Sequence, residues 1–398
     1  MVKNLKLYCE TSKIFLFNIT PITFTIDLSD DACVLHLTQF ASYFYKLNPN
    51  KPKSNTQKLI KELINNLKSI YYSVNSDYKK LKSNFFSKPK MHNSFIDCLQ
   101  ENNYIWLLKP TVYNRGRGIE LFNNLDQFQK FIKEYSDGIF DKNLLLQNHI
   151  NKNNQNNINN NNKSFKSYQL LKSSTFVIQK YIEKPLLIFG RKFDIRIFVF
   201  VNYNMDCYIY KCGYIRTASQ LFKIGDFQNQ FIHLTNNAVQ KYAQNYGQFE
   251  DGNILSLEQL QSQMNQYPAF DFYGKIWPKI KDICLMTLQS VKKKINSDDR
   301  KHCFELFGYD FFIDEDFKVW LIEINSNPCL EESNFYLSQL MPRMIDDMFK
   351  ISLDQLFTKP NGYANKIQQK FTIDGQNDDE NLWQFMINLS LNNNNKQN

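Results

Sequence analysis

The chain has 398 residues and a formal net charge of +9, and 43% of its residues are hydrophobic. This length and apolar content predict two or three packed domains with cores of their own. No run of about 18 uncharged apolar residues is present, which argues against a membrane span. The first residues, "MVKNLKLYCETSK", lack the pattern of a signal peptide. We therefore expect a cytoplasmic protein that does not bind membranes.

The charge and the cysteines narrow the class further. Eight scattered cysteines without a CxxC pair exclude a zinc ribbon and fit thiols in a reducing compartment. A basic balance favours an acidic partner, although a lysine-rich solvated surface gives the same net charge. No recognised nucleic-acid-binding module is visible, so we expect no nucleic-acid partner.

The first part of the chain, residues 1–99, is predicted to be a small N-terminal domain. The stretch "IFLFNITPITFTIDL" is rich in β-branched and aromatic residues around Pro21, and it predicts a strand, a turn and a second strand. Apolar residues at helical spacing in "TQKLIKELINNLKSIYYSV" predict an amphipathic helix at residues 56–74.

Residues 100–190 are predicted to form a central lobe. Two strand-like segments, "YIWLLK" and "STFVIQKYI", flank an asparagine-rich stretch at residues 148–164. This stretch has too little apolar content to pack, so it predicts a disordered insertion. A second asparagine tract ends the chain, and residues 359–398 are predicted to be a polar, partly disordered tail.

Residues 191–358 are predicted to form a C-terminal lobe that holds the metal and substrate site. The segments "KFDIRIFVFV" and "CYIYKCGYIRTAS" indicate strands, and "SQLMPRMIDDMFKISLDQLF" indicates a closing helix. A long helix before residue 295 places Ile280, Ile283, Cys284 and Leu288 on one face. The mixture of strands and helices predicts an α+β or α/β layered architecture.

The most informative motif is a hairpin in "LFGYDFFIDEDFKVWLIEINSNP". Pairing about a turn at residues 315–317 places Asp310 opposite Glu323, and period-two geometry puts Asn325 on the same face as Glu323. Two carboxylates and an amide oxygen suit Mg²⁺ shared with nucleotide phosphates. A sheet with one solvated face is the alternative interpretation.

Two further motifs carry positive charge. Lys109 ends a strand, and "NRGRG" follows it; glycines let a backbone approach phosphates closely, but an ordinary hairpin turn explains this motif equally well. On another strand, Lys192, Asp194 and Arg196 alternate and share one face. They form either a binding surface or a cross-strand ladder of salt bridges.

Two motifs follow that strand. Arg216 in "GYIRTAS" is suited to hold a carboxylate or a transferring phosphoryl group. His233 in "HLTNNAVQK" is expected to be structural, and the spacing of the chain shows no Ser–His–Asp or Cys–His arrangement, which argues against a covalent hydrolase. Together the motifs point to ATP and magnesium held between two lobes.

These motifs, in their order along residues 104–357, resemble the tubulin–tyrosine ligase and ligase-like family. The segments that carry the resemblance are "VIQKYIEKPLL", "KFDIR", "GYIRTAS", "HLTNNAVQKYAQNYGQFEDGN" and "LFGYDFFIDEDFKVWLIEINSNP". The resemblance implies an ATP-grasp fold, in which two α+β lobes clamp ATP. It also implies an N-terminal domain that is truncated or divergent, since family members usually carry more sequence before the segment that resembles "NITPITF".

The resemblance assigns roles to particular residues. Nucleotide contacts fall on a lysine, the glycine-rich loop, an adenine-binding hinge strand and the "HLTNN" motif: Lys109, Arg115, Gly116, Arg117, Gly118, Gln179, Lys180, Tyr181, Ile182, Thr235 and Asn236. The Mg²⁺ ligands are Asp310, Glu323 and Asn325, in agreement with the hairpin. The residues that hold the reacting carboxylates and the amino acid are Lys192, Asp194, Arg196 and Arg216.

The implied activity is ATP- and Mg²⁺-dependent ligation of an amino acid to carboxylates of the acidic tubulin tail, through an acyl phosphate. "KPTVYNRGRGI" resembles the glutamate- or glycine-adding branches, whereas "GYIRTAS" with "NYGQFEDGN" resembles the tyrosine-adding branch. The implied partners are microtubules, including those of cilia, and a free amino acid, and the enzyme is expected to be a monomer. The alternatives are a weak or inactive microtubule-binding relative and a ligase for a non-tubulin acceptor.

Overall fold

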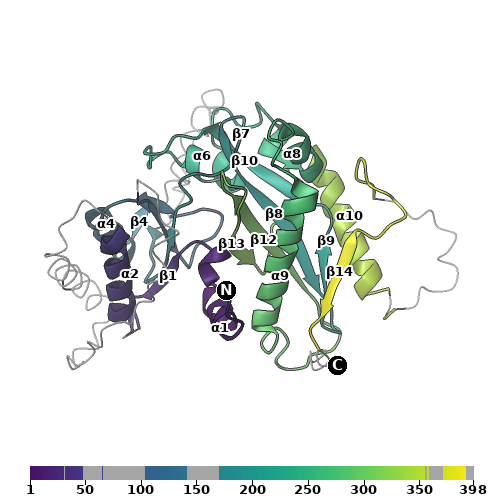
Figure 1. Ribbon diagram of the computed structural model, residues 1–398, viewed down its shortest axis with the longest axis horizontal. Helices are drawn as coiled ribbons and strands as arrows, with labels where there is room; N and C mark the ends of the chain where they lie inside the picture. The colour runs from purple at the N-terminus through teal and green to yellow at the C-terminus, as the bar shows by residue number, and fades with distance from the viewer. Residues whose placement is uncertain are drawn as a thin grey trace, which may run out of the picture. The chain divides into compact units, whose positions relative to one another are not determined.

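The computed structural model describes residues 1–30, 32–47, 65, 104–140, 170–354, 356–357 and 371–390. Contacts between residues divide the chain into two units, each containing helices and strands (Figure 1). The larger unit consists of Met1–Pro21, Lys184–Phe222 and Phe231–Asn398, and the smaller unit consists of Ile22–Glu183 and Lys223–Gln230. The α+β class expected from the sequence is therefore confirmed.

The elements of the larger unit are, in chain order, α1 (Val2–Thr11), η1 (Leu16–Asn18), β7 (Leu187–Ile188), β8 (Arg191–Val201), β9 (Asp206–Tyr210), β10 (Tyr214–Leu221), α7 (Asn237–Gln240), η4 (Asp251–Asn253), β11 (Ile254–Ser256), α8 (Leu257–Gln263), η5 (Phe272–Ile276), α9 (Trp277–Val291), β12 (Glu305–Ile313), β13 (Val319–Asn325), α10 (Phe335–Ser352) and β14 (Trp383–Asn388). The short helix α6 (Gln230–His233) begins at the boundary between the units. The smaller unit contains β1 (Thr23–Asp27), α2 (Cys33–Leu47), β2 (Trp106–Pro110), β3 (Glu120–Phe122), α4 (Leu125–Asp137), β4 (Ile139–Phe140), β5 (Leu170–Leu171) and β6 (Thr175–Lys180).

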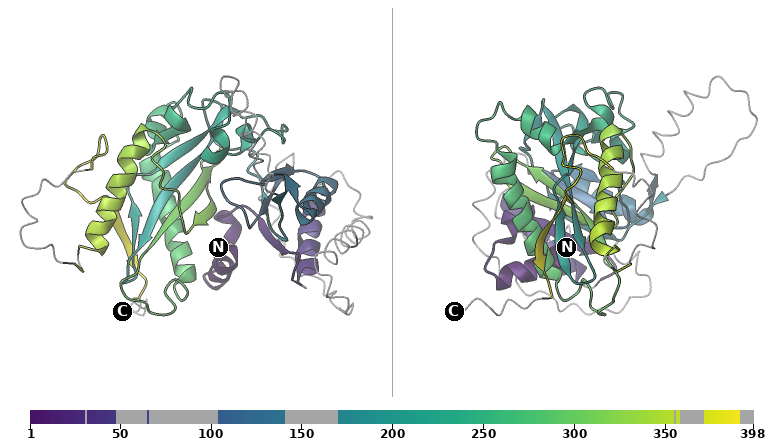
Figure 2. Two further views of the ribbon diagram at one scale, coloured as in Figure 1. Left: turned by 180° about the vertical axis from the view of Figure 1, so that it is seen from behind. Right: turned by 90° about the vertical axis from the view of Figure 1, so that its right-hand side faces the viewer.

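The larger unit is built on an antiparallel sheet with the order β11-β10-β8-β12-β13. β10 pairs with the first half of β8, and β9 pairs with its end, where β14 adds a further strand beside β9. All eleven residues of β8 are buried, so this strand lies at the centre of the unit. Figure 2 shows this sheet from two further directions.

The two faces of the β8 sheet are covered differently. On one face, alternate residues from Phe193 to Val201 pack in a core with α9, whose apolar face is the one expected from the sequence: Ile280, Ile283, Cys284 and Leu288 are all buried there. On the other face, Phe198 and Phe200 pack against buried leucine and methionine side chains of α10. Lys192, Asp194 and Arg196 at the start of β8 lie on this second face, because side chains alternate along a strand.

The smaller unit has a four-stranded antiparallel sheet with the order β1-β6-β2-β3. Its core is aromatic: Phe40 of α2 lies 5.3 Å from Trp106 and 5.1 Å from Phe128, measured between ring centroids. The helix α4 begins at Asn124, whose side chain accepts a hydrogen bond from Gln127 N. The strands predicted from "YIWLLK" and "STFVIQKYI" are thus present as the neighbouring strands β2 and β6.

The expected division of the chain at residues 99 and 190 differs from the observed one, because residues 1–21 pack with the C-terminal sequence. Leu5 and Cys9 of α1 enter the same core as α9, and Leu321 N of β13 donates to Ile19 O. The strand–turn–strand prediction for "IFLFNITPITFTIDL" is half wrong: the first part forms the 3₁₀ helix η1, because its apolar residues bury Leu16 and Ile19 in that core. The helix predicted at residues 56–74, except Asn65, and the insertion at 148–164 lie outside the described residues.

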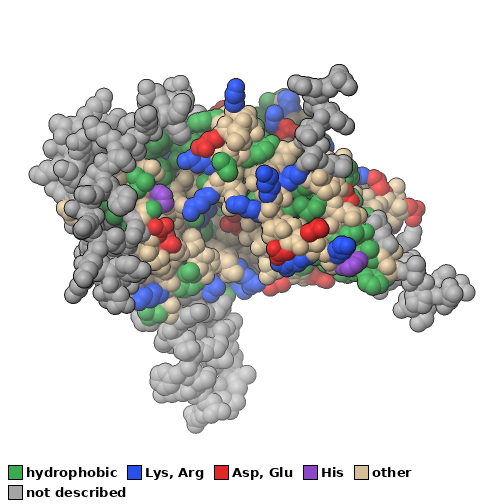
Figure 3. Space-filling model, turned by 90° about the horizontal axis from the view of Figure 1, so that it is seen from below, with side chains coloured by type: hydrophobic (Ala, Val, Ile, Leu, Met, Phe, Trp, Pro, Cys, Tyr) green, Lys and Arg blue, Asp and Glu red, His purple; other side chains and the backbone are tan. Residues whose placement is uncertain are grey.

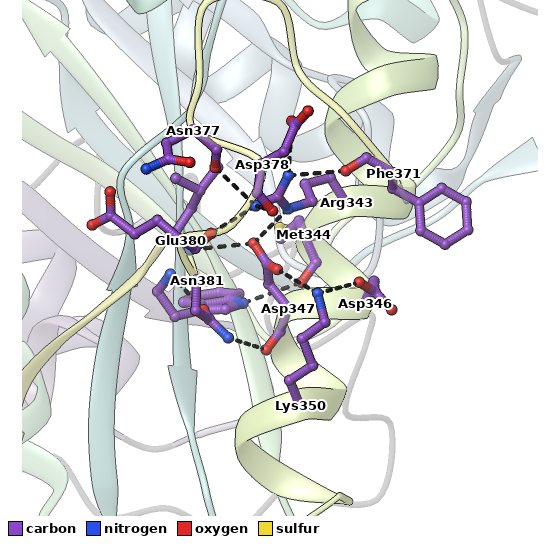
Figure 4. Close-up of polar contacts among 12 residues, drawn as sticks. Arg343, Met344, Asp346, Asp347, Lys350, Phe371, Asn377, Asp378, Glu380 and Asn381 are labelled. Carbon is purple, nitrogen blue, oxygen red and sulfur yellow. Dashed lines mark hydrogen bonds and ion pairs between the residues drawn. The ribbon is translucent and has the colours of Figure 1, made fainter. Parts of the chain in front are cut away.

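Near its end the chain is held by Arg343 of α10, within the larger unit (Figure 4). The guanidinium of Arg343 donates to four backbone carbonyls, at distances from 2.6 to 3.3 Å, those of Phe371, Asn377, Asp378 and Glu380. Asp347, one turn further along α10, accepts from Arg343 Nε at 3.0 Å and from Leu382 N at 3.2 Å. These contacts place β14 beside β9.

The charged side chains do not gather by sign on the face drawn in Figure 3. Lys and Arg side chains are interspersed there with Asp and Glu over the described part of the surface. On this face, the net charge of +9 does not appear as a patch of one sign that would mark an acidic partner. Among the described helices, none is long and apolar enough to cross a bilayer.

Candidate active site

The hairpin of β12 and β13 has the register expected from the sequence. Asp310 lies opposite Glu323, and Gly308 lies opposite Asn325, with a register shift directly after Asp310. The two strands are joined at residues 314–318, so the turn predicted at 315–317 is confirmed. Asp310 is buried, whereas Glu323 and Asn325 are half-buried at the end of β13.

The three predicted magnesium ligands meet at one point. Asn325 Nδ2 lies 3.2 Å from Glu323 Oε1 and 3.5 Å from Asp310 Oδ2, so the amide stands between the two carboxylates. Turning the amide about its last torsion would replace this donor by Oδ1 and give three oxygens around the same point. Such a set fits Mg²⁺ that takes its remaining ligands from phosphates and water. No cluster of three or more His, Cys, Asp or Glu side chains in the described ranges could hold a metal without such help.

Asp310 also belongs to a chain of buried ion pairs that crosses three strands. Arg196 of β8 donates from Nη2 to Asp310 Oδ2 at 3.1 Å, and Arg216 of β10 approaches the same oxygen at 2.9 Å. Arg216 in turn holds Asp194 of β8 through two hydrogen bonds of 2.7 and 2.6 Å. The cross-strand ion pairs of the ladder interpretation are therefore present, and they bring the residues of the binding-surface interpretation together.

These charges lie at most 8% exposed, in a region from which water is largely excluded. Burial alone would raise the pKa of Asp310, but the charges of Arg196 and Arg216 outweigh it and hold that pKa well below its usual range. The pKa of Arg196 is raised, because the attraction of Asp310 exceeds the opposing effect of burial. All three groups therefore remain charged at neutral pH.

One guanidinium nitrogen in this group of ion pairs has no hydrogen-bond acceptor among the described residues. Arg196 Nη1 is buried and makes no hydrogen bond with any described residue. It lies against Gly308, where an added Cβ would come within 3.1 Å of it. A buried donor without an acceptor is costly to leave unpaired, so this atom is suited to an oxygen supplied by a ligand.

The "HLTNN" motif supplies further contacts to the same cluster. Thr235 Oγ1 donates to Asp194 Oδ2 at 2.7 Å, and Lys192 Nζ donates to the backbone oxygen of His233 at 3.1 Å. The Lys192 ammonium also lies 4.3 Å from the centre of the Phe312 ring. Asn236, the N-cap residue of α7, is half-buried beside Thr235. The structure thus groups all four predicted substrate-holding residues with Thr235.

The predicted nucleotide-binding residues of the smaller unit form a second group. Lys109 Nζ of β2 donates to Gln179 Oε1 of β6 at 2.7 Å, and Gln179 Nε2 donates to Thr23 Oγ1 of β1 at 3.2 Å. Lys109 is half-buried and Gln179 is 3% exposed, so the sheet holds the lysine through a hydrogen bond to a neutral side chain. A positioned ammonium of this kind suits a phosphate oxygen.

The glycine-rich motif forms the connection between β2 and β3. Three of its residues have left-handed backbone angles, with φ of +59° at Arg115, +79° at Gly116 and +73° at Gly118. A Cβ at Gly118 would come within 3.1 Å of Tyr135 Oη, which donates to the Gly118 carbonyl at 2.9 Å. Glycine at this position is therefore required by both backbone angle and space. Arg115 is exposed, and the guanidinium of Arg117 lies 5.8 Å from the Tyr113 ring centre.

The segment that follows the hinge strand contains a residue, Glu183, that sequence reasoning misses. Lys180 is 6% exposed and forms a 2.6 Å ion pair with Glu183, which also accepts a 2.7 Å hydrogen bond from Ile105 N. Tyr181 N donates to Ile105 O, so both ends of this backbone segment are fixed. Tyr181 and Ile182 are buried. Glu183 follows the strand and has no periodic signal; only the short spacing from Lys180 could have indicated the pair.

Comparison with known proteins supports the family resemblance independently of the structure. The model of the tubulin-tyrosine ligase family matches residues 37–361, which is more than half of the chain. Over 258 residues, 64% of this chain, it is 34% identical to tubulin glycylase 3B of Tetrahymena thermophila, of which this covers 19%. Over 302 residues, 73% of this chain, it is 32% identical to the probable tubulin polyglutamylase TTLL9 of Bos taurus, of which this covers 64%.

A third relative is the probable alpha-tubulin polyglutamylase Ttll1 of Tetrahymena thermophila, which is 31% identical over 271 residues. The match takes in 67% of this chain and 58% of that protein. The chain thus spans less than two thirds of the length of each of these relatives. The family match includes β2, β3 and β6 of the smaller unit's sheet and the whole ion-pair cluster, whereas β1 lies before it.

Proposed function

Because the chain belongs to the tubulin-tyrosine ligase family, whose ATP-grasp fold agrees with its two α+β units, we propose that it is an ATP- and Mg²⁺-dependent ligase. It joins glutamate or glycine to side-chain carboxylates of the acidic tubulin tail. The named relatives, a glycylase and two probable polyglutamylases, support these two amino acids over tyrosine. The acceptor is a microtubule, so the protein acts at the cytoskeleton.

The observation that carries this proposal is the buried chain Asp194–Arg216–Asp310–Arg196 next to Glu323 and Asn325. A ligase of this kind must bring nucleotide phosphates, an acceptor carboxylate and an amino-acid carboxylate together, although these anions repel one another. Fixed arginines in a region of low dielectric constant stabilise such charges more strongly than water-exposed ones. The unpaired Arg196 Nη1 gives this region a donor that is ready for an incoming oxygen.

The reaction has two steps. The acceptor carboxylate oxygen bonds to the γ-phosphorus of ATP while the bond to ADP breaks; the amine nitrogen then attacks the resulting acyl carbon, and phosphate leaves with the former carboxylate oxygen. Asp310, Glu323 and Asn325 would hold Mg²⁺, and the bound ion would supply positive charge to the phosphates. In this proposal, Arg216 holds the acceptor or amino-acid carboxylate, and Lys109 holds a phosphate oxygen.

The test is incorporation of labelled glutamate, glycine or tyrosine into microtubules by the purified protein with MgATP. We expect incorporation of glutamate or glycine, and its loss in Glu323→Gln, which keeps the size of the side chain but removes a carboxylate. Glu315→Gln is the matched control, because Glu315 is exposed in the hairpin turn and pairs with Lys184 at the surface. Equal turnover in Glu323→Gln would refute the metal assignment, and incorporation of tyrosine alone would refute the choice of amino acid.

Microtubules whose acidic tails have been removed by limited proteolysis distinguish the acceptor. We expect no incorporation into them. If they are labelled as well as intact microtubules, the carboxylates of the tail are not the acceptor. If no substrate is labelled under any condition, while the protein still binds ATP, the proposed activity toward tubulin fails.

A further inference from the structure

The strand that carries Arg216 has an irregularity that begins one residue further on, after Thr217. Arg216 lies opposite Asp194 and Thr217 opposite Phe193, but the next aligned pair is Leu221 and Arg191. Three residues of β10, 218–220, therefore correspond to a single residue of β8. A bulge of this kind removes backbone groups from the strand ladder, and each such group needs another partner where it is buried.

Buried side chains supply these partners. Arg191 Nη1 donates to Ala218 O at 3.2 Å, and Asn253 Nδ2 donates to Thr217 O at 3.0 Å. Ser219 N donates to Gln240 Oε1 at 2.8 Å. The bulge is thus held by three side chains that come from β8, α7 and η4. Each of the three is at most 2% exposed, so water does not substitute for these contacts.

We call the residues that hold the bulge, Arg191, Gln240 and Asn253, together with Glu250, the frame. Within this frame, Glu250 balances the charge of Arg191. Glu250 accepts from Arg191 Nη1 at 2.9 Å and also from Nη2, and Thr217 Oγ1 donates to Glu250 Oε2 at 3.0 Å. The ring of Phe249 covers the Arg191 guanidinium at 4.3 Å. This ion pair contacts neither Asp194 nor Asp310 in any hydrogen bond described above. It acts on the bulge, not on the cluster itself.

Gln240 links the bulge to the other residue that contacts Asp194. While its Oε1 accepts from Ser219 N, its Nε2 donates to the backbone oxygens of Leu234 and Phe231. Leu234 directly precedes Thr235, whose hydroxyl donates to Asp194. One amide therefore connects the backbone three residues after Arg216 with the backbone one residue before Thr235.

We propose that Gln240, supported by the Arg191–Glu250 pair, is a positioning residue that holds Arg216 and Thr235 together on Asp194. The inference rests on the proposed ligase function, because it assigns Gln240 an effect on the step in which Arg216 holds a carboxylate. Gln240 itself touches no reacting group. Misplacement of a binding group by about 1 Å can lower turnover about 100-fold, so a frame of this kind has a large effect.

The test is a double-mutant cycle with Gln240→Met and Arg216→Lys. Methionine keeps the length of glutamine but removes all three hydrogen bonds of its side chain. We expect Gln240→Met to lower kcat at least about 10-fold, with the KM for MgATP changed less than about twofold, since Lys109 and Gln179 are untouched. In the Arg216→Lys protein, we expect Gln240→Met to lower kcat little further, because the effects of substitutions at residues that act through one another are not additive. If the fall in kcat of the double variant equals the product of the falls in the two single variants, the proposal is overturned.

Gln259→Met is the matched control. Gln259 is exposed at the start of α8 and accepts a hydrogen bond from Ser256 N, so its loss weakens a helix cap without touching the bulge. We expect it to lower the melting temperature slightly and leave kcat unchanged. If Gln240→Met does not fold, Glu250→Gln tests the same frame, because it keeps the side-chain volume and removes the charge that Arg191 pairs with. Additive losses with Arg216→Lys would contradict the proposal for this variant as well.

Amide hydrogen exchange of the ATP-free protein separates this proposal from the ligase activity. We expect Gln240→Met, but not Gln259→Met, to speed exchange at Ser219 and in the following residues of β10. This exchange should occur by local opening, at a rate faster than that of global unfolding. Unchanged exchange there would overturn the frame whether or not the protein is active. If the wild-type protein labels no acceptor but exchange changes as expected, the proposed function fails and the frame stands as a structural one.

Discussion

Asp194 and Arg216 lie directly opposite each other on β8 and β10 and share two hydrogen bonds of 2.7 and 2.6 Å. The same guanidinium reaches Asp310 on the other side of β8 at 2.9 Å. One arginine therefore joins the residue that Thr235 contacts to a predicted magnesium ligand. Its planar, forked geometry is required for this double role, and a lysine cannot reproduce it.

Replacement of Arg216 by lysine should consequently abolish most of the activity while keeping the charge. We expect kcat for amino-acid incorporation to fall at least about 100-fold, because one ammonium cannot hold both carboxylates in the present geometry. Arg300→Lys is the control, since Arg300 pairs with Asp298 on the surface with 73% of its side chain exposed. Steady-state kinetics checks the prediction, and turnover within threefold of the wild type would contradict it.

A second prediction concerns nucleotide binding by the smaller unit. Lys109→Met removes the ammonium that Gln179 orients, and we expect the Kd for a fluorescent ATP analogue to rise about 10-fold, equivalent to about 1.4 kcal/mol. Lys130→Met on the exposed face of α4 is the matched control, because Lys130 makes only a surface ion pair of 3.7 Å with Glu134. If both variants bind equally well, Lys109 does not contact the phosphates.

The hairpin shows what periodicity can predict. Asp310, Glu323 and Asn325 follow from a turn and a period of two, and the register places the two carboxylates as expected. The role of Lys109 rests on a resemblance and remains a prediction, although its contact with Gln179 agrees with it. Local pattern was sufficient for these residues because the two strands are joined by a short turn.

The frame around the bulge shows where such reasoning ends. Arg191 and Glu250 are 59 residues apart, and Gln240 lies 21 residues from Ser219. Their contacts depend on an insertion into the β10 ladder, which leaves no periodic signal, and on buried polar atoms that need partners. In the same way, residues 1–21 pack far along the chain with α9, which no local pattern indicates.

A third prediction concerns pH. Burial raises the pKa of Cys207 and of Cys212 to about 12, whereas an unfolded thiol ionises near pH 8.5. Since the folded-state pKa is the higher one, stability is fully present below about pH 8.5 and is lost as the pH rises toward 12. Between pH 7 and pH 10 we expect each thiol to lower the free energy of unfolding by about 2 kcal/mol.

Urea unfolding of the wild type and of Cys212→Ala at the two pH values measures this effect. The variant should lose about 2 kcal/mol less than the wild type between pH 7 and pH 10. Cys329→Ala is the control, because Cys329 is exposed and its substitution should leave the pH dependence unchanged. An equal fall in all three proteins would show that Cys212 ionises as readily in the folded state as in the unfolded state.

The last prediction concerns the C-terminal segment that Arg343 holds (Figure 4). Arg343 is 1% exposed, and its four carbonyl contacts and its ion pair with Asp347 have no substitute in water. Arg343→Met removes all of them and leaves the buried Asp347 with the longer, 3.4 Å ion pair to Lys350. We expect a loss of about 3 kcal/mol in the free energy of unfolding, typical of breaking one side of a buried pair.

The expected loss of stability in Arg343→Met comes from the sheet as well as from the ion pair. β14 pairs with β9, which pairs with the end of β8, so release of residues 371–390 would leave β9 as an exposed edge. Amide exchange should therefore become faster in β14 before the rest of the unit opens. Lys350→Met removes a half-exposed ion pair with Asp346 and the 3.4 Å ion pair with Asp347, but it leaves Arg343 in contact with Asp347, so it should cost less than about 1 kcal/mol. Equal losses in the two variants would mean that Arg343 does not anchor the segment.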